Sequence, residues 1–407
     1  MTKPMEGIRI LEVAEHTFVP AASSILADWG AEVIKIEHVT RGDAMRGLMS
    51  TGLSVFEGKV QVIMEHSNRG KKSIGLDLSD PAGLEVLYKL AATCDVFLTN
   101  KMPGVRSRLK IDVEDIKKAN PNMIYARGSG YGNLGPDADA GGYDFLGFWA
   151  RAGCAESATP SDVAGRTPQP GPAFGDSTGG MTIAGGIAAA LLRRERTGEA
   201  GIVDVSLLGT GMWAMSAAVA LTELLGGPWR SGPSTSIGSG FNPLVGSYKT
   251  SDDRYIAFSM LQGFQYWPEF CERVGRPELV TDERFATHED LMTNANVASG
   301  IVAELIASRT FEEWKATLQG MKGQWAPMQN TAELFDDPQV IANGYIQDAA
   351  TSDGTPFKLV ASPVQFDDQP TTTSRGPEFN EHCEEILHLI GLDEEAIIDL
   401  KIKGIVA

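Results

Sequence analysis

Short apolar runs alternate with longer amphipathic segments along the first part of the chain. Residues 8–13 are typical of a strand, residues 20–29 of a helix that ends at Gly30, and residues 32–37 of a second strand. Two parallel strands need a crossover between them, and that crossover is usually a helix. The opening of the chain therefore predicts a β-α-β unit of an α/β fold.

The same alternation continues to about residue 225. The pattern predicts strands at 72–78, 95–98, 123–126 and 202–207, and helices at 80–93, 113–119, 181–196 and 210–225, the last of them buried. A Gly-rich stretch at 171–180 is predicted to be a loop. We therefore expect residues 1–225 to form one large domain around an open parallel sheet.

The composition of the chain changes after residue 225. Glycine, proline and serine are concentrated between residues 226 and 240, which is typical of a connecting segment. Beyond it the pattern predicts an antiparallel hairpin with its turn at Asp252 and Asp253, and then helices at 266–274, 294–308 and 311–321. We expect a smaller α+β domain over residues 226–330, followed by a C-terminal segment, residues 331–407, that returns to the first sheet.

The charge of the chain restricts its partners. The net charge is −18, with 43% hydrophobic and 22% charged residues, an ordinary composition for a globular protein. A strongly acidic protein is repelled by nucleic-acid phosphates and by anionic membrane surfaces. We therefore expect no nucleic-acid or membrane partner, and a phosphorylated ligand would need a local cluster of basic side chains.

The cysteines and the N-terminus bear on the compartment of the protein. None of the four cysteines belongs to a CxxC pair, and no histidine is placed so as to suggest a zinc site with them, so we expect reduced thiols and no metal site. The N-terminus lacks an apolar run followed by a small-residue cleavage site, and the other apolar stretches are too short or too interrupted by glycine for a membrane span. These features favour a cytoplasmic protein.

One glycine motif suggests a dinucleotide site. Residues 130–135 fit the pattern GxGxxG, but Pro136 follows at the point where a helix should open. The acidic residue that should contact the ribose about 20 residues later is missing as well. A Gly-rich turn after a strand is therefore the preferred interpretation.

A second motif allows two kinds of nucleophile. Residues 175–179 fit the pattern GxSxG, which would make Ser177 a hydrolase nucleophile with His382 as its base, but prolines occupy the positions of the central strand that should precede it. Asp176 is the alternative, since a carboxylate among small residues near a helix start is accessible and favoured by the helix-end amides. The spacing alone favours a plain capping role for Asp176 or Ser177, with the helix beginning near Thr178.

Many short blocks in the same order make the chain similar to class III CoA-transferases. The blocks that carry the resemblance are residues 7–12, 26–37, 68–78, 103–108, 174–181, 203–208 and 390–392. The resemblance extends along nearly the whole chain. It implies an open Rossmann-like sheet in the large domain and an interlocked homodimer, in which each chain threads through its partner.

The resemblance gives the catalytic role to Asp176. In this family the matching aspartate attacks an acyl-CoA thioester, which gives an aspartyl–acyl anhydride and then an aspartyl–CoA thioester. The resemblance also places Tyr143 and Asp144 at the site, and it implies a mobile glycine loop, with Gly238 and Gly240, that closes over the intermediates. An ordinary hinge between domains is the other explanation of this loop.

The resemblance also identifies candidates for binding CoA. They match family positions near its phosphates, adenine or pantetheine: His38, Arg41, Lys71, Lys72, Leu76, Asn100 and Arg108. Among basic side chains, arginine alone offers a bidentate fork to a phosphate. CoA and acyl-CoA are then substrates together with a carboxylic acid, and no permanently bound cofactor is expected.

One residue separates transfer from racemisation. Acyl-CoA racemases of the same fold resemble this chain, but they have a histidine at the place of Tyr143. Racemisation needs an acid/base group on each side of the α-carbon, and tyrosine is a poor base at neutral pH. Transfer is therefore predicted, with a 2-methylacyl-CoA racemase as the alternative. Glu15, Thr17, Phe18 and Lys101 differ from an oxalate-type member, which argues against oxalate as the acceptor.

Overall fold

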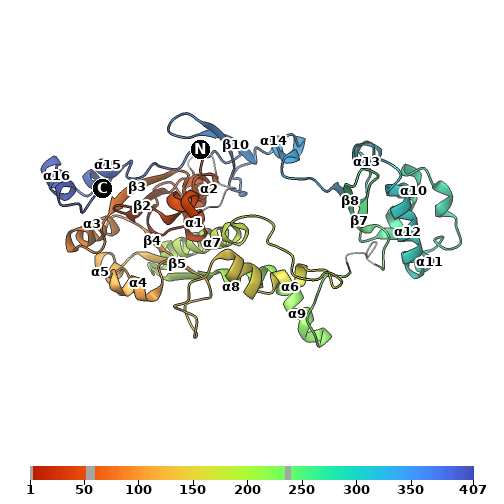
Figure 1. The fold of residues 1–407 in the computed structure, drawn as a ribbon, viewed down its shortest axis with the longest axis horizontal. Helices are drawn as coiled ribbons and strands as arrows, with labels where there is room; N and C mark the ends of the chain where they lie inside the picture. The colour runs from red at the N-terminus through yellow and green to blue at the C-terminus, as the bar shows by residue number, and fades with distance from the viewer. Residues whose placement is uncertain (1–2, 52–59, 234–239) are drawn as a thin grey trace. The chain divides into compact units, whose positions relative to one another are not determined.

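Six parallel strands from the N-terminal half of the chain form the main sheet (Figure 1). The computed structural model describes residues 3–51, 60–233 and 240–407. The sheet has the order β3-β2-β1-β4-β5-β6, and its strands are β1 (Arg9–Val13), β2 (Glu32–His38), β3 (Lys71–Leu76), β4 (Val96–Thr99), β5 (Ile124–Ser129) and β6 (Ile202–Ser206). All neighbouring pairs are parallel, so the predicted open α/β fold is confirmed.

The strand order places a crevice at the carboxyl ends of two central strands. β1 pairs with β2 on one side and with β4 on the other, so the crossovers leave the centre of the sheet in opposite directions. In open α/β sheets a ligand binds outside the carboxyl ends of the strands at such a reversal. The residues that follow Val13 and Thr99 are therefore the expected place for a ligand site.

Helices cover both faces of the sheet because apolar side chains alternate along its strands. Ile10 and Leu98 face one core, whereas their neighbours Leu11 and Phe97 face the other. The helices on the two cores are α1 (Phe18–Asp28) and α7 (Phe174–Thr197) for the first, and α3 (Pro81–Ala91), α5 (Val113–Ala119) and α15 (Cys383–Leu389) for the second.

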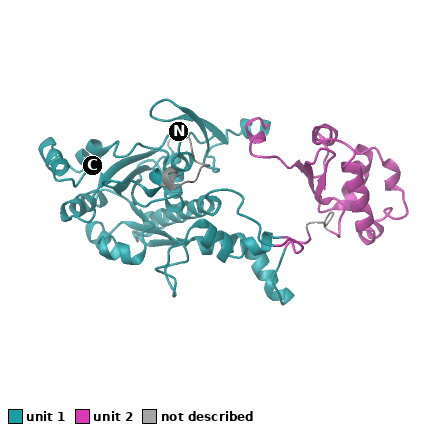
Figure 2. Ribbon diagram, viewed as in Figure 1, with its two compact units in different colours: residues 1–159, 165–230, 338–407 teal, residues 160–164, 231–337 magenta. Residues whose placement is uncertain are grey.

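The chain divides into two compact units (Figure 2). The first comprises residues 1–159, 165–230 and 338–407, and the second comprises residues 160–164 and 231–337. The first unit contains the main sheet and its two cores. The second unit has its own three-stranded sheet and its own core.

The hairpin predicted in the second unit is confirmed: β7 pairs with β8 in antiparallel fashion, and β9 joins them. The elements of this unit are β7 (Val245–Lys249), β8 (Tyr255–Ser259), α10 (Gly263–Arg273), η4 (Pro277–Val280), α11 (His288–Thr293), α12 (Ala295–Ile306), α13 (Phe311–Leu318), β9 (Trp325–Pro327) and η5 (Glu333–Phe335). The remaining elements of the first unit are η1 (Ala44–Thr51), α2 (Val62–Asn68), α4 (Pro103–Arg108), η3 (Phe145–Arg151), α6 (Cys154–Ala158), α8 (Leu207–Ala214), α9 (Ser216–Leu225), α14 (Pro338–Ala342), β10 (Ile346–Ala350), β11 (Pro356–Val360) and α16 (Glu394–Ile402).

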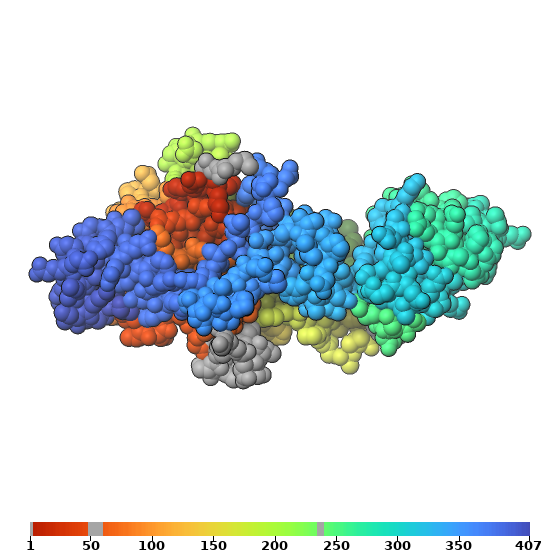
Figure 3. All heavy atoms as spheres, turned by 90° about the horizontal axis from the view of Figure 1, so that it is seen from above, coloured from red at the N-terminus to blue at the C-terminus, as the bar shows by residue number. Residues whose placement is uncertain are grey.

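The C-terminal segment lies against the main sheet. The backbone N–H of Asp77 donates to the Ile405 carbonyl at 2.9 Å, and Leu76 forms an isolated bridge with Val406. Ile386 enters the second core of the sheet. In Figure 3 the blue C-terminal part of the chain lies beside red and orange parts from near the N-terminus. The end of the chain therefore completes the core on this face.

Helix α7 begins at Phe174, so much of the stretch 171–180 that was predicted to be a loop is helical. The glycines of this stretch serve close packing. A Cβ atom on Gly179 would lie 2.3 Å from the ring of Phe18 in α1. Glycine therefore allows α1 and α7 to approach each other here, and glycine content alone was a misleading sign of a loop.

The apolar segment 210–225 is not one buried helix, as predicted, but two helices. α8 and α9 meet at an angle of 66°. None of the residues of α9 is buried in this chain, and Leu224 is 82% exposed. No single helix of the described ranges is long and apolar enough to cross a membrane. α8 and α9 reach that length and hydropathy only when they are taken together.

Candidate active site

Two adjoining cavities open at the crevice between β1 and β4. The first has a volume of about 390 Å³ and the second about 290 Å³. The residues common to both walls are Glu15, Arg41, Lys101, Val105 and Arg108. The first cavity extends to Tyr143 and Asp176, and the second extends to His38 and Leu76. The main sheet thus carries a continuous groove with two differently lined parts.

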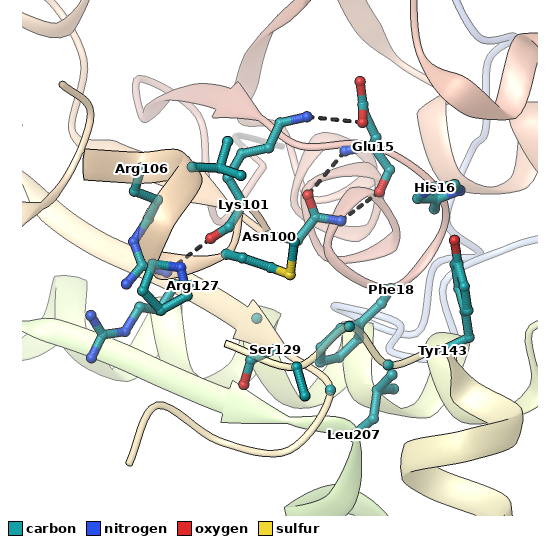
Figure 4. A pocket seen from close by; sticks show the side chains of 18 of the residues that line it. Glu15, His16, Phe18, Asn100, Lys101, Arg106, Arg127, Ser129, Tyr143 and Leu207 are labelled. Carbon is teal, nitrogen blue, oxygen red and sulfur yellow. Dashed lines mark hydrogen bonds and ion pairs between the residues drawn. The ribbon is translucent and has the colours of Figure 1, made fainter. Parts of the chain in front are cut away.

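The loops after β1 and β4 are held together where the cavities meet (Figure 4). The backbone N–H of Glu15 donates to Asn100 Oδ1 at 3.2 Å, and Asn100 Nδ2 donates to the Glu15 carbonyl at 2.6 Å. Lys101 Nζ lies 2.9 Å from the Glu15 carboxylate. Asn100, predicted to bind CoA, therefore joins two carboxyl-end loops into one wall.

Asp176 lies in the first turn of α7. Ala173 precedes the helix with φ 57°, and no side chain caps it, so the predicted capping role of Asp176 or Ser177 is not observed. The Asp176 carboxyl group lines the first cavity, and none of the described residues donates a hydrogen bond to it. Burial raises the pKa of Asp176 to about 8, and the negative charge of Asp144 adds to this effect.

Asp144 is an anchored anion. Its Oδ1 accepts from the backbone N–H of Phe145 at 2.7 Å, at the start of η3, and its Oδ2 accepts from Gln169 Nε2 at 2.6 Å. These two bonds fix the direction of the carboxylate. The field that Asp144 exerts on Asp176 is therefore built into the structure.

Two aromatic side chains lie opposite each other in the wall of the first cavity. The ring centroids of His16 and Tyr143 are 5.5 Å apart, with the rings perpendicular. Phe18 and Leu207 form an apolar part of the same wall. His16 is not among the site residues predicted from the sequence. Its place directly after a central strand, at the reversal of strand order, is the signal that could have found it.

Cationic and apolar side chains line the second cavity. Arg41 is mostly exposed, with its guanidinium 3.8 Å from the Glu15 carboxylate, and Arg108 is exposed with no ion-pair partner within the described part of the chain. His38 and Leu76 belong to the carboxyl ends of β2 and β3. The four side chains, all predicted to contact CoA, are therefore brought together by the structure.

Lys71 and Lys72 line neither cavity. Lys71 Nζ is buried and lies 2.7 Å from the Glu12 carboxylate. Lys72 lies on the edge strand, where it pairs with Glu32 and Glu385. A lysine that compensates a buried carboxylate has no ammonium group left for a phosphate. The expectation that Lys71 contacts CoA is therefore wrong, whereas the contact of the partly exposed Lys72 with CoA stays a prediction.

Ser177 does not form a hydrolase triad with His382. Ser177 Oγ lies 3.1 Å from His66 Nε2, whereas His382 Nδ1 accepts from the Ser73 N–H at 3.3 Å. Burial lowers the pKa of His66 to about 4. Ser177 lines neither cavity, and no carboxylate of the described residues is hydrogen-bonded to the His66 ring. The arrangement lacks the orienting acid of a hydrolase triad.

The stretch 130–135 is a turn, as predicted. It follows β5, and the next helical element begins only at Phe145. A Cβ atom on Gly130 would lie 2.8 Å from Gly142 Cα, so the glycine is required by close backbone contact. Gly130 and Gly142 both line the first cavity. The motif shapes the groove instead of opening a dinucleotide-binding helix.

The glycine loop falls largely outside the structure. Gly238 lies outside the described residues, and Gly240, with φ 74°, belongs to the second unit. Their role as a lid stays a prediction. Over the described ranges, no group of three or more histidine, cysteine, aspartate and glutamate side chains is arranged to hold a metal ion.

Comparisons with known proteins point to one family. A family model described as "CoA-transferase family III" matches residues 5–383. The (R)-2-hydroxy-4-methylpentanoate CoA-transferase of Clostridioides difficile is 28% identical over 98% of each chain. The mouse succinyl-CoA:glutarate CoA-transferase is 30% identical over 99% of this chain and 90% of its own.

The fold is similar to that of solved structures as well. The crystal structure of a CaiB/BaiF family protein from Brucella suis has a TM-score of 0.79 and 26% sequence identity. The match covers 96% of this chain and 100% of that one. The similarity therefore includes both compact units.

Proposed function

Because the chain belongs to CoA-transferase family III, we propose that it transfers CoA from an acyl-CoA to a carboxylic acid, with Asp176 as the nucleophile. One observation carries the proposal: the Asp176 carboxyl group lines a cavity and has no hydrogen-bond partner among the described residues. A second cavity with cationic walls continues from the first. Such a groove suits a ligand with phosphates at one end and a reactive acyl group at the other.

The proposed chemistry begins with ionised Asp176. A carboxylate oxygen adds to the thioester carbonyl, the C–S bond breaks, and CoA leaves as a thiolate, which gives an aspartyl–acyl anhydride. The thiolate attacks the aspartyl carbonyl, releases the donor acid and forms an aspartyl–CoA thioester. The acceptor carboxylate then displaces CoA thiolate, and the thiolate takes the new acyl group from the second anhydride. Asp176 is regenerated, and each step keeps an activated acyl bond.

CoA is expected to lie across both cavities. Arg41 and Arg108 offer guanidinium groups at the second cavity, and His38 adds a third polar side chain there. Their local positive charge is needed because the whole chain carries −18 and repels a polyanion. Leu76 and the loop held by Asn100 would contact the adenine and pantetheine parts of CoA.

The anhydride must be kept from water, since it hydrolyses readily. We propose that the loop with Gly238 and Gly240 closes over the groove during turnover, as glycine permits. Tyr143 lies at the same cavity as Asp176. A tyrosine cannot serve as the second base of a racemase at neutral pH, so racemisation is not part of the proposal.

The same family membership supports an interlocked homodimer. The exposed apolar side chains of α8 and α9, with Trp213 at 79% and Leu224 at 82% exposure, suit burial against a second copy. Contact with a second copy would cover these two apolar helices, which are exposed in a single chain.

Trapping the covalent intermediate tests the proposed nucleophile. The enzyme would be incubated with an acyl-CoA panel and an acid in the presence of hydroxylamine, and the peptides analysed by mass spectrometry. We expect an aspartyl hydroxamate at Asp176. Asp176→Ala should lose more than about 10³-fold in transfer, because it removes the group that forms the covalent bond.

Ser177→Ala is the matched control, since it alters the next residue of the same helix. It should keep most of the transfer activity, and its adduct should remain at Asp176. Full activity of Asp176→Ala, or a hydroxamate at another residue, would contradict the proposed nucleophile.

A further inference from the structure

His16 has a backbone conformation that few residues adopt. Its φ is 67°, in the left-handed region, where histidine is enriched several-fold over most other non-glycine residues. The backbone N–H of His16 donates to Asp43 Oδ1 at 3.0 Å, and Asp43 is itself fixed by Lys35 at 2.7 Å. The main chain therefore holds this position, and the side chain is not needed for it.

The imidazole ring of His16 is directed into the first cavity. Neither ring nitrogen is hydrogen-bonded to any residue that the structure describes, and the only ring contact is the edge of Tyr143 at 5.5 Å between centroids. Figure 4 shows His16 and Tyr143 turned toward each other, with Phe18 and Leu207 close by. The ring nitrogens are therefore open to a ligand, and a ligand that covered them without a hydrogen-bonding partner would bind with a loss of free energy.

His16 shares a cavity with the proposed nucleophile, and the phosphate candidates Arg41 and Arg108 border both cavities. His16 lines the first cavity, with Asp176, and not the second, with His38 and Leu76. Its hydrogen-bonding atoms are therefore available to the acyl or acid portion of the substrate. A neutral imidazole donates through one nitrogen and accepts through the other, and the protonated ring donates through both.

We infer that His16 selects carboxylic acids that carry an oxygen substituent, a hydroxyl or a second carboxylate, near the carboxyl group that reacts at Asp176. The inference rests on the proposed function, because it places the reacting carboxyl group at Asp176. Phe18 and Leu207 then contact the carbon chain, and the His16 ring binds the substituent. An unsubstituted acid covers the ring without pairing with it, which lowers the kcat/KM of that acid.

Matched pairs of acids test this selection. Wild-type enzyme should prefer lactate to propionate, succinate to butyrate, or both, as acceptors measured by kcat/KM. In His16→Phe, which keeps a ring but has no hydrogen-bonding atom, the preference should fall about tenfold. His16→Asn, which tolerates the left-handed backbone, should lose less of it. If the preference for lactate over propionate falls in His16→Phe, the substituent that His16 binds is a hydroxyl. If the preference for succinate over butyrate falls, the substituent is a carboxylate.

A surface histidine provides the control. His388 lies on α15 with its ring near Leu392 and Glu394, so His388→Phe should leave both ratios unchanged. A wild-type enzyme that uses both members of each pair equally would overturn the inference. Ratios that stay within about twofold of wild type in His16→Phe would overturn it too.

A binding measurement separates this inference from the proposed nucleophile. Calorimetric titration of the same acids into the CoA-saturated protein requires no turnover, and it can be done with Asp176→Asn as well. His16→Phe should abolish the difference in affinity within a pair. If Asp176→Ala proved fully active while the affinity difference still depended on His16, the proposed nucleophile would fail and the role of His16 would stand. If the difference survived His16→Phe, the role of His16 would fail alone.

Discussion

Ionisable side chains of the first unit fall into two groups, according to whether a neighbouring opposite charge compensates them. The buried Glu12 carboxylate pairs with the ammonium groups of both Lys35 and Lys71, so none of these groups is available to a ligand. No described residue places a cation or a hydrogen-bond donor beside Asp176, whose pKa is raised to about 8. Chemistry is possible at the uncompensated group, because its protonation and bonding can still change.

The rate of transfer should follow the ionisation of Asp176. We expect kcat/KM to increase with pH up to about pH 8, because the attacking group must be a carboxylate and the pKa of Asp176 is raised to about 8. Asp144→Asn removes the negative charge that contributes to this rise, so the pKa of Asp176 falls and the increase shifts to lower pH. Initial rates between about pH 5 and pH 10 measure the shift.

Asp144→Glu keeps the charge and should keep the wild-type profile. If the profiles of Asp144→Asn and wild type superimpose, the field of Asp144 does not act on the nucleophile.

Substitutions of the two neighbouring lysines should differ sharply in their effect on stability. Lys71→Ala removes one of the two buried lysines that pair with Glu12, Lys35 being the other, and should lower the free energy of unfolding by about 1–3 kcal/mol. Lys72→Ala removes a partly exposed ion pair and should cost less than about 1 kcal/mol. Urea denaturation measures both variants. Lys71→Ala should not alter the KM for acyl-CoA in protein that remains folded, and a selective rise for Lys72→Ala would support that lysine as a CoA contact.

At the scale of elements, one helix joins the packing of the fold to the site. The first turns of α7 carry Asp176, and the same turns approach α1 through glycines. Phe18 of α1 fills the space left by Gly179 and also lines the first cavity. The position of the nucleophile therefore depends on how closely these two helices pack.

Two alanine substitutions in α7 should have opposite effects on stability. Gly179→Ala places a Cβ 2.3 Å from the Phe18 ring and should destabilise the protein by about 1–3 kcal/mol. Gly185→Ala adds a Cβ with no atom within 4 Å and should stabilise it by up to about 1 kcal/mol, because alanine favours a helix. Thermal unfolding compares them. Equal melting temperatures would show that the approach of α1 and α7 does not require glycine.

At the scale of the whole molecule, strand order creates the groove, and the exposed apolar helices α8 and α9 favour association with a partner. The reversal between β1 and β4 leaves a crevice that the following loops line. In contrast to the groove, α8 and α9 expose apolar side chains, and an apolar surface of this kind is normally covered by another protein surface. The proposed homodimer accounts for them.

A charge on α9 should weaken the proposed homodimer. Leu224→Asp puts a carboxylate on a side chain that is 82% exposed in one chain and is expected to be buried between two. Sedimentation velocity should then detect monomers or aggregates. Ile402→Asp, at an 80% exposed residue of α16, is the control and should keep the mass of the wild type. A dimer that tolerates Leu224→Asp would place the interface elsewhere.

Much of the fold could be predicted because local burial leaves a period in the sequence. The strands around Leu11, Ile34 and Phe97 were placed within two residues, since apolar alternation and turn residues bound them. The start of α7 was missed because the same glycines that favour loops also permit close helix packing. Local composition cannot distinguish these two uses.

The sequence by itself determined the order of the elements, the alternating faces of the sheet and the family, and through the family it pointed to Asp176. Only the tertiary structure decided which side chains share a space: Arg108 lines the groove, Lys71 is buried beside Glu12, and His16 faces Tyr143. The reason is physical. Periodicity records whether a residue is buried, whereas the neighbours of a side chain depend on strand order and on the packing of elements far apart in the chain.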